Sequence, residues 1–166
     1  MTLDQEPPTL GHYGTHEIYP MPAFATLAVA DVAAVAAWYE RALGFSTVFA
    51  GPSIGGQPAL VHLRRRKYQE LLLTPAPTGG APTDAPSSLT LSFSVQDEVD
   101  ALAERARSVA PLGRSTITGP VDTPWNTRDL RVTDPAGHRL VFTGLNPNPD
   151  PEQQARIKAM FESGAR

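Results

Sequence analysis

Apolar and polar positions follow a definite order in the first half of the chain. Residues 24–29 are predicted to form a β-strand, with Leu27 and Val29 on one face and Phe24, Thr26 and Ala28 on the other. Asp31 is a favourable N-cap, and apolar residues then recur at helical spacing up to Leu43, until Gly44 ends the pattern. Three further strands are predicted at 45–49, 57–64 and 68–74, the last two forming a hairpin. The order is therefore strand, helix and three strands.

The same order occurs again in the second half. A strand is predicted at 89–95, and Asp97 then takes the place that Asp31 has in the first half, before a helix whose segment closes at Gly113. Three strands are predicted after it, at about 114–119, 128–133 and 139–143. A repeat of this length predicts two similar modules, each with one sheet face that its helix leaves uncovered.

The segments outside the repeats differ in composition. Residues 1–22 contain four prolines and little periodicity, which indicates an extended arm. Residues 76–87 are rich in Pro, Gly, Ala and Thr, as a linker is, and a short helix is predicted at 152–162. The predicted organisation is an arm at 1–22, one domain at 23–146 (module 1 at 23–75, the linker at 76–87, module 2 at 88–146) and a helical tail at 147–166.

The composition excludes several classes of function. None of the 166 residues is a cysteine, which excludes disulfides, thiolate metal sites and a cysteine nucleophile. The net charge of −3 gives no electrostatic reason to expect a nucleic-acid partner. No apolar run approaches the roughly 20 residues that cross a bilayer, and the first residues lack the apolar core of a signal peptide. We therefore expect a cytoplasmic protein with neither a membrane nor a nucleic-acid partner.

Four short segments carry a family resemblance. Ala28-Val-Ala-Asp31, Ala37-Trp-Tyr-Glu40 and Ala42-Leu-Gly-Phe45 lie in the first module, and Asp134-Pro-Ala-Gly137 in the second has the proline and glycine of a tight turn. Together they resemble the vicinal oxygen chelate superfamily of glyoxalases, bleomycin resistance proteins and extradiol dioxygenases. The resemblance implies an α+β fold in which two tandem βαβββ modules form a curved sheet around a cavity. It also implies a homodimer.

The resemblance further indicates where metal-dependent members of the family supply their ligands, in the first and last strands of each module. Here those positions hold Phe24, Thr90 and Val141, and only the position near Glu70 offers a carboxylate. One carboxylate does not hold Zn²⁺, Ni²⁺, Mn²⁺ or Fe²⁺, which take three or four ligands. We therefore expect no metal and no cofactor, and a binding function rather than metal-dependent catalysis.

Strand alternation predicts the side chains that line the cavity. The bleomycin-resistance branch, which the chain resembles, sequesters an antibiotic without chemistry, so the expected ligand is an aromatic or peptide-like natural product bound for self-resistance. Trp125 is the candidate stacking partner for a flat ligand, and anchoring of its loop against the sheet is the other interpretation. The candidate ligand-binding residues are Phe24, Thr26, Thr90, Ser92, Trp125, Arg128 and Val141.

The alternative function is a metal-free lyase, isomerase or cyclase in which Glu70 or His62 transfers a proton. A three-residue hairpin turn at 65–67 places the two side chains opposite each other, and a two-residue turn places them on opposite faces. A hydrogen-bonded pair without a catalytic role is the plainer interpretation. A glyoxalase-like metalloenzyme ranks last among the candidate functions. His12 and His16 are four residues apart, which is the spacing of a metal site on a helix, but the prolines around them disfavour a helix.

Overall fold

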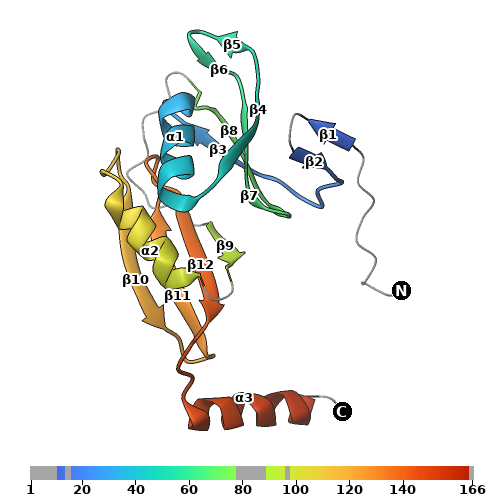
Figure 1. Ribbon diagram of the computed structural model, residues 1–166, viewed down its shortest axis with the longest axis vertical. Helices are drawn as coiled ribbons and strands as arrows, with labels where there is room; N and C mark the ends of the chain where they lie inside the picture. Colours follow the sequence, from blue (N-terminus) through green and yellow to red (C-terminus); the bar gives the residue numbers. More distant parts are fainter. Residues whose placement is uncertain (1–10, 14–15, 78–88, 96–97, 165–166) are drawn as a thin grey trace. The chain divides into compact units, whose positions relative to one another are not determined.

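The computed structural model describes residues 11–13, 16–77, 89–95 and 98–164. It divides into two compact units, Met1–Ala81 and Pro82–Arg166 (Figure 1). Most of the linker expected at 76–87 lies outside the described residues. Each unit contains one mixed four-stranded sheet with a helix packed on one face, so the predicted α+β fold of two βαβββ modules is confirmed.

The sheet of the first unit has the strand order β3-β8-β7-β4. Its outer strand β3 runs parallel to β8, and the other neighbours are antiparallel. A two-stranded hairpin, β5 and β6, occupies the glycine-rich segment between β4 and β7. The elements are β3 (Ala25–Val29), α1 (Val32–Leu43), β4 (Ser46–Ala50), β5 (Ser53–Ile54), β6 (Gln57–Pro58), β7 (Val61–Arg66) and β8 (Gln69–Pro75).

Helix α1 forms where the pattern predicts it. The Asp31 side chain accepts a hydrogen bond of 2.8 Å from the Ala34 backbone N–H, and Gly44 ends the helix with a left-handed backbone at φ 72°. The apolar side of α1, with Trp38 and Tyr39 fully buried, packs on strands β4, β7 and β8. This packing leaves the opposite face of the sheet without a covering helix of its own unit, and we call that face the open face of the first unit.

The segment expected as an extended arm contains a short hairpin of β1 (Gly11–Tyr13) and β2 (His16–Ile18). No proline lies between residues 11 and 19, so every backbone N–H of this stretch is free to pair with a neighbouring strand. Tyr19, directly after β2, is buried with 6 % of its surface exposed. The segment therefore packs on its unit through this tyrosine.

The second unit repeats the architecture with the strand order β10-β11-β12-β9. Strand β9 runs parallel to β12, and the remaining pairs are antiparallel. Helix α2 packs on β10, β11 and β12 through Leu102, Ala103 and Ala106. The elements are β9 (Thr90–Ser94), α2 (Val99–Ser108), β10 (Thr116–Asp122), β11 (Thr127–Thr133), β12 (Arg139–Leu145) and a terminal helix α3 (Pro151–Gly164).

Two local features of the second unit differ from the first. The N-cap of α2 is Glu98, whose side chain makes no capping hydrogen bond, and Asp97, the expected counterpart of Asp31, lies outside the described residues. The Asp134 turn forms as predicted, because the buried Asp134 carboxylate accepts hydrogen bonds from the backbone N–H groups of Ala136 and His138 at 2.9 and 2.8 Å. None of the helices in the described ranges is long and apolar enough to cross a membrane.

Candidate functional site

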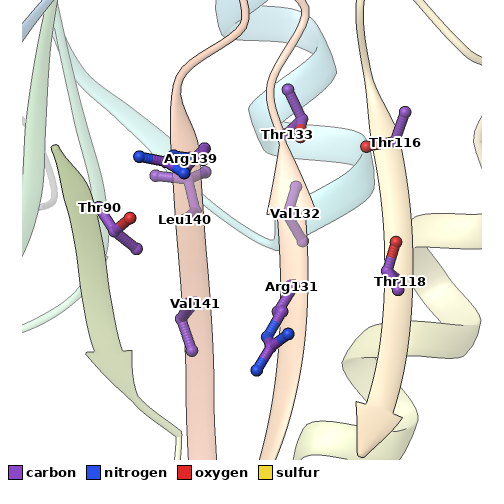
Figure 2. A pocket seen from close by; sticks show the side chains of 9 residues that line it. All are labelled: Thr90, Thr116, Thr118, Arg131, Val132, Thr133, Arg139, Leu140 and Val141. Carbon is purple, nitrogen blue, oxygen red and sulfur yellow. The ribbon is translucent and has the colours of Figure 1, made fainter. Parts of the chain in front are cut away.

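A pocket of about 370 Å³ lies on the sheet face of the second unit that is turned away from α2, which we call the open face of the second unit (Figure 2). Four threonines and two arginines project into it, and Val141 adds an apolar contact. The buried residues Val132 and Leu140 complete the lining from the core layer. The lining residues are Thr90, Thr116, Thr118, Arg131, Val132, Thr133, Arg139, Leu140 and Val141.

Strand register explains why these side chains gather. Residues directly opposite each other on neighbouring strands point to the same face of a sheet, so they form rows across it. One row crosses all four strands as Thr116, Thr133, Arg139 and Thr90, and the next row consists of Thr118, Arg131, Val141 and Ser92. Two of the predicted ligand-binding residues, Thr90 and Val141, line the pocket, and Ser92 lies in the second row beside Val141.

The pocket carries positive charge. Its lining contains two guanidinium groups and no carboxylate. Within the described part of the chain, neither Arg131 nor Arg139 has an acidic side chain within ion-pair distance, whereas Arg64 and Arg128 each bind at least one carboxylate. The pocket therefore presents two cationic hydrogen-bond donors together with threonine hydroxyls, which both donate and accept.

The third row of the open face contains a buried acid, Asp129. Thr143 lies opposite it on β12, and the Thr143 hydroxyl donates a hydrogen bond of 2.7 Å to Asp129 Oδ1. The Thr127 hydroxyl donates to the same oxygen at 3.1 Å. These hydrogen bonds satisfy the buried carboxylate of Asp129 and hold it in place, in the row of residues next to the pocket.

Arg128 does not share the face of Val141. In β11 it lies on the same face as Leu130, and its guanidinium pairs with Asp100 of α2 at 3.0 Å and with Asp122 of β10 at 2.6 Å. The hydrogen bonds that Arg128 donates to these two carboxylates raise the pKa of Arg128 above its usual value. Arg128 was expected to line the ligand cavity together with Val141. Alternation along β11 instead places Arg128 on the helix side of the sheet and Arg131 on the open face.

Trp125 lies in the loop between β10 and β11, and 63 % of its surface is exposed. The loop is held by a 3.2 Å hydrogen bond from the Asn126 N–H to the Thr123 carbonyl, and Asn126 has a left-handed backbone with φ 62°. Trp125 is outside the pocket lining. Thr127, next to this loop, lies four positions before Arg131 on β11, a distance of about 13 Å along the strand.

The predicted residues of the first unit lie near a second polar cluster. Thr26 is exposed on β3, and the ring of Phe24, just before β3, contacts the ring of His62 edge-on at 5.3 Å between centroids. His62 Nε2 in turn hydrogen-bonds the carboxylate of Glu70, whose side chain is fully buried. Because an ionised carboxylate only accepts hydrogen bonds, His62 is the donor.

Two further groups converge on Glu70. Arg64 Nε donates to Glu70 Oε1 at 2.7 Å, and the Tyr19 hydroxyl donates to the same oxygen. The guanidinium of Arg64 lies over the Tyr19 ring at 4.6 Å from its centroid. Burial, together with the hydrogen bond to Glu70, raises the pKa of Tyr19 to about 12. We call Tyr19, His62, Arg64 and Glu70 the Glu70 cluster.

The contact between His62 and Glu70 forms for a reason that the sequence did not reveal. Strand β7 ends at Arg66 and pairs it with Gln69, so the turn has two residues, and a two-residue turn was expected to separate the side chains. A bulge between Arg64 and Arg66 shifts the register by one residue and places Arg64 opposite Glu70. His62, two residues from Arg64, therefore shares the face of Glu70.

The residues at the expected metal-ligand positions do not fit a metal. The Glu70 carboxylate is already engaged by Tyr19, His62 and Arg64, and Phe24 offers no ligand atom. Among the residues that the structure describes, no group of three or more His, Cys, Asp or Glu side chains is arranged to hold an ion. His12 and His16 belong to strands β1 and β2 and not to a helix.

A family model described as the glyoxalase/bleomycin resistance protein/dioxygenase superfamily matches residues 11–142. The chain belongs to this family. No curated protein matches it in sequence. This membership confirms the resemblance that the four short sequence segments indicated.

Several solved structures share the fold. A bleomycin-binding protein complexed with bleomycin is 25 % identical, with 75 % of this chain and 98 % of that chain covered and a TM-score of 0.56. A bleomycin resistance determinant encoded on the transposon Tn5 is 23 % identical, with 76 % and 98 % covered and a TM-score of 0.57. TnmS3, an antibiotic-binding protein from Streptomyces sp. CB03234, is 22 % identical, with 74 % and 93 % covered and a TM-score of 0.54. The family thus includes proteins that bind antibiotics.

Proposed function

We propose that this protein binds an aromatic or peptide-like natural product and holds it without chemical change, as a self-resistance protein does. The observation that carries the proposal is the pocket on the open face of the second unit, in a fold shared with a protein solved in complex with bleomycin. A volume of about 370 Å³ falls within the range of small-molecule sites. The mixture of hydroxyl, guanidinium and aliphatic groups supplies both orientation and apolar contact.

The chemistry of the lining favours binding over catalysis. None of the nine lining residues is a His, Asp, Glu, Lys, Cys or Tyr. An arginine stays protonated at neutral pH and a threonine hydroxyl does not ionise there, so this pocket has no group poised to exchange a proton with its ligand. A ligand held here is therefore expected to leave unaltered.

Trp125 gives the proposal a direct test, because the only other tryptophan, Trp38, is buried under α1. The protein is titrated with a panel of aromatic and peptide-like antibiotics of positive, negative and zero charge, and Trp fluorescence and heat of binding are recorded. We expect at least one compound to bind saturably and to be recovered with unchanged mass after incubation. Failure of every compound to bind in calorimetry would overturn the proposal.

The variant Trp125→Phe separates stacking from binding elsewhere. If Trp125 stacks on the ligand, the variant loses both the fluorescence change and part of the affinity. If the tryptophan only reports on a neighbouring site, calorimetry gives the parent affinity for the variant. Either result leaves the proposed function in place and decides the role of this side chain.

A homodimer is part of the proposal. The family resemblance implies it, and light scattering at concentrations from micromolar to near-millimolar measures it directly. The expected mass is twice that of the 17.8 kDa chain, and a monomer at all concentrations would remove this part of the proposal.

The Glu70 cluster supports a second candidate, a metal-free lyase, isomerase or cyclase. Glu70 accepts three hydrogen bonds and is fully buried, so His62, whose side chain is partly exposed, is the group that can meet a substrate. Recovery of an altered compound, with His62→Gln abolishing the alteration while binding persists, would favour this candidate. Recovery of the compound unaltered in every case would exclude it for that panel.

A further inference from the structure

We propose that the pocket of the second unit is an oxyanion subsite, in which Arg131 and Arg139 bind a carboxylate or a chemically similar oxyanion of an organic ligand. This inference rests on the proposed function, because it names the chemical class of the ligand that the pocket takes. It goes beyond that function by predicting that the ligand is negatively charged and that two named side chains bind its charged group.

The two arginines are diagonal neighbours on the open face. Arg131 lies opposite Val141, and Arg139 lies opposite Thr133, so the two residues occupy adjacent rows on adjacent strands. Diagonal neighbours of this kind lie about 7–8 Å apart, so two long side chains can reach one ligand group. Figure 2 shows Arg139 extending toward Thr90 and Arg131 lying beside Val141.

The positive charges of Arg131 and Arg139 are not balanced by acidic side chains of the pocket. Two half-buried arginines, Arg64 and Arg128, are neutralised within the protein: Arg64 by Glu70, and Arg128 by Asp100 and Asp122. Arg131 and Arg139 are exposed, and in the ranges that the structure covers neither guanidinium has a carboxylate within ion-pair distance. The nearest acid along β11, Asp129, lies outside the pocket lining and accepts hydrogen bonds from two threonine hydroxyls. Two like charges on adjacent strands repel each other, and a bound anion removes that repulsion.

A guanidinium presents parallel N–H groups that match the two oxygens of a carboxylate, and charge-assisted hydrogen bonds of this kind are about twice as strong as neutral ones. The hydroxyls of Thr90, Thr118 and Thr133 line the same pocket and can donate to remaining lone pairs. Val141, on the same face, offers an aliphatic contact for the carbon skeleton that carries the anion, which favours an organic acid over a free inorganic ion.

The test uses 2-naphthoate as an aromatic carboxylate and 2-naphthamide as its uncharged counterpart, with the full-length protein in a calorimeter. Arg131→Gln/Arg139→Gln removes both cations. Arg156→Gln/Lys158→Gln is the matched control, because it removes the same charge from two exposed side chains of α3. We expect the parent to prefer the naphthoate by at least about ten-fold, and the pocket variant, but not the control, to lose that preference.

Equal affinity of the parent for 2-naphthoate and 2-naphthamide, no binding of the naphthoate, or full naphthoate affinity in the pocket variant would each overturn the inference. Inorganic phosphate is the competing arm. If phosphate displaces 2-naphthoate and binds the pocket with a lower dissociation constant than 2-naphthoate does, the pocket takes a free ion and the assignment to an organic acid is wrong. Circular dichroism melting of both double variants confirms that each is folded.

The outcomes separate this inference from the proposed function. If an antibiotic that carries a carboxylate binds the parent and the pocket variant equally, the protein is a binding protein and the oxyanion subsite is wrong. If the naphthoate binds through the two arginines while no antibiotic of the panel binds, the subsite stands and the proposed function falls.

Discussion

The hydroxyl of Tyr19 donates a hydrogen bond to the carboxylate of Glu70, although the two residues are 51 positions apart in the chain. The same hydroxyl oxygen accepts a hydrogen bond of 2.9 Å from the backbone N–H of Tyr68, in the turn between β7 and β8. One phenol group thus joins the segment after β2 to the turn and to β8. Because all three groups are buried or half-buried, the loss of any one leaves a polar partner without its hydrogen bond.

The first prediction concerns this hydroxyl. Tyr19→Phe keeps the ring under Arg64 but removes the donor to Glu70 and the acceptor of the Tyr68 N–H. We expect the free energy of unfolding to fall by about 1–3 kcal/mol, measured by urea denaturation. Tyr68→Phe is the control, since Tyr68 is exposed and takes part in this arrangement through its backbone. Equal stability of Tyr19→Phe and the parent would contradict the prediction.

The second prediction concerns alkaline pH. The pKa of Tyr19 is raised from 10.0 to about 12 in the folded protein, so folding favours the protonated phenol. Its contribution is fully present below pH 10 and is lost as the pH rises toward 12. We expect the stability difference between the parent and Tyr19→Phe to shrink over this range by roughly 1–3 kcal/mol, followed by urea denaturation at a series of pH values. A difference that stays constant to the alkaline end of the series would show that the phenol titrates normally.

The third prediction concerns His138 and Asp134. His138 Nδ1 lies 3.0 Å from the buried carboxylate of Asp134, and this hydrogen bond raises the pKa of His138 above 6.5 despite partial burial. Its stabilising contribution is therefore full below pH 6.5 and is lost as the pH rises through the raised value. We expect the parent to lose more stability than His138→Gln between mildly acidic and mildly alkaline pH. Parallel pH profiles of the two proteins would rule out the ion pair as a source of stability.

The fourth prediction concerns Gly113, which has a left-handed backbone with φ 55°. A Cβ atom at this position would lie 2.5 Å from the Pro135 carbonyl oxygen, which belongs to the backbone of the Asp134 turn. Gly55 has a similar φ of 62° but nothing within 4 Å, so Gly55→Ala carries the backbone strain alone, about 1–2 kcal/mol. We expect Gly113→Ala to cost at least about 1 kcal/mol more, measured as the loss of unfolding free energy. Equal costs for the two variants would mean that the turn moves aside freely.

Much of the fold follows from the sequence because short-range signals decide it. Asp31 and Gly44 delimit α1 through local capping and a left-handed backbone, which do not depend on distant residues. The repeated order of strand, helix and three strands fixed the α+β modules, and alternation in β9 and β12 assigned Thr90 and Val141 to one face. The same alternation in β11 contains the signal for Arg131, since Leu130 and Val132 point to the core on either side of it.

Tertiary structure decided the features that depend on register and on distant partners. The bulge between Arg64 and Arg66 brought His62 to the face of Glu70, and a single inserted residue of this kind has no distinctive local pattern. Tyr19 hydrogen-bonds Glu70, a residue 51 positions further along the chain. Arg128 forms an ion pair with Asp100 of α2, whereas Arg131 and Arg139 line the pocket. The sequence by itself determined which elements form, because caps, turns and periodicity act between near neighbours. Only the folded chain decided which charges are neutralised and which remain to meet a ligand, because that depends on the pairing of strands far apart in sequence.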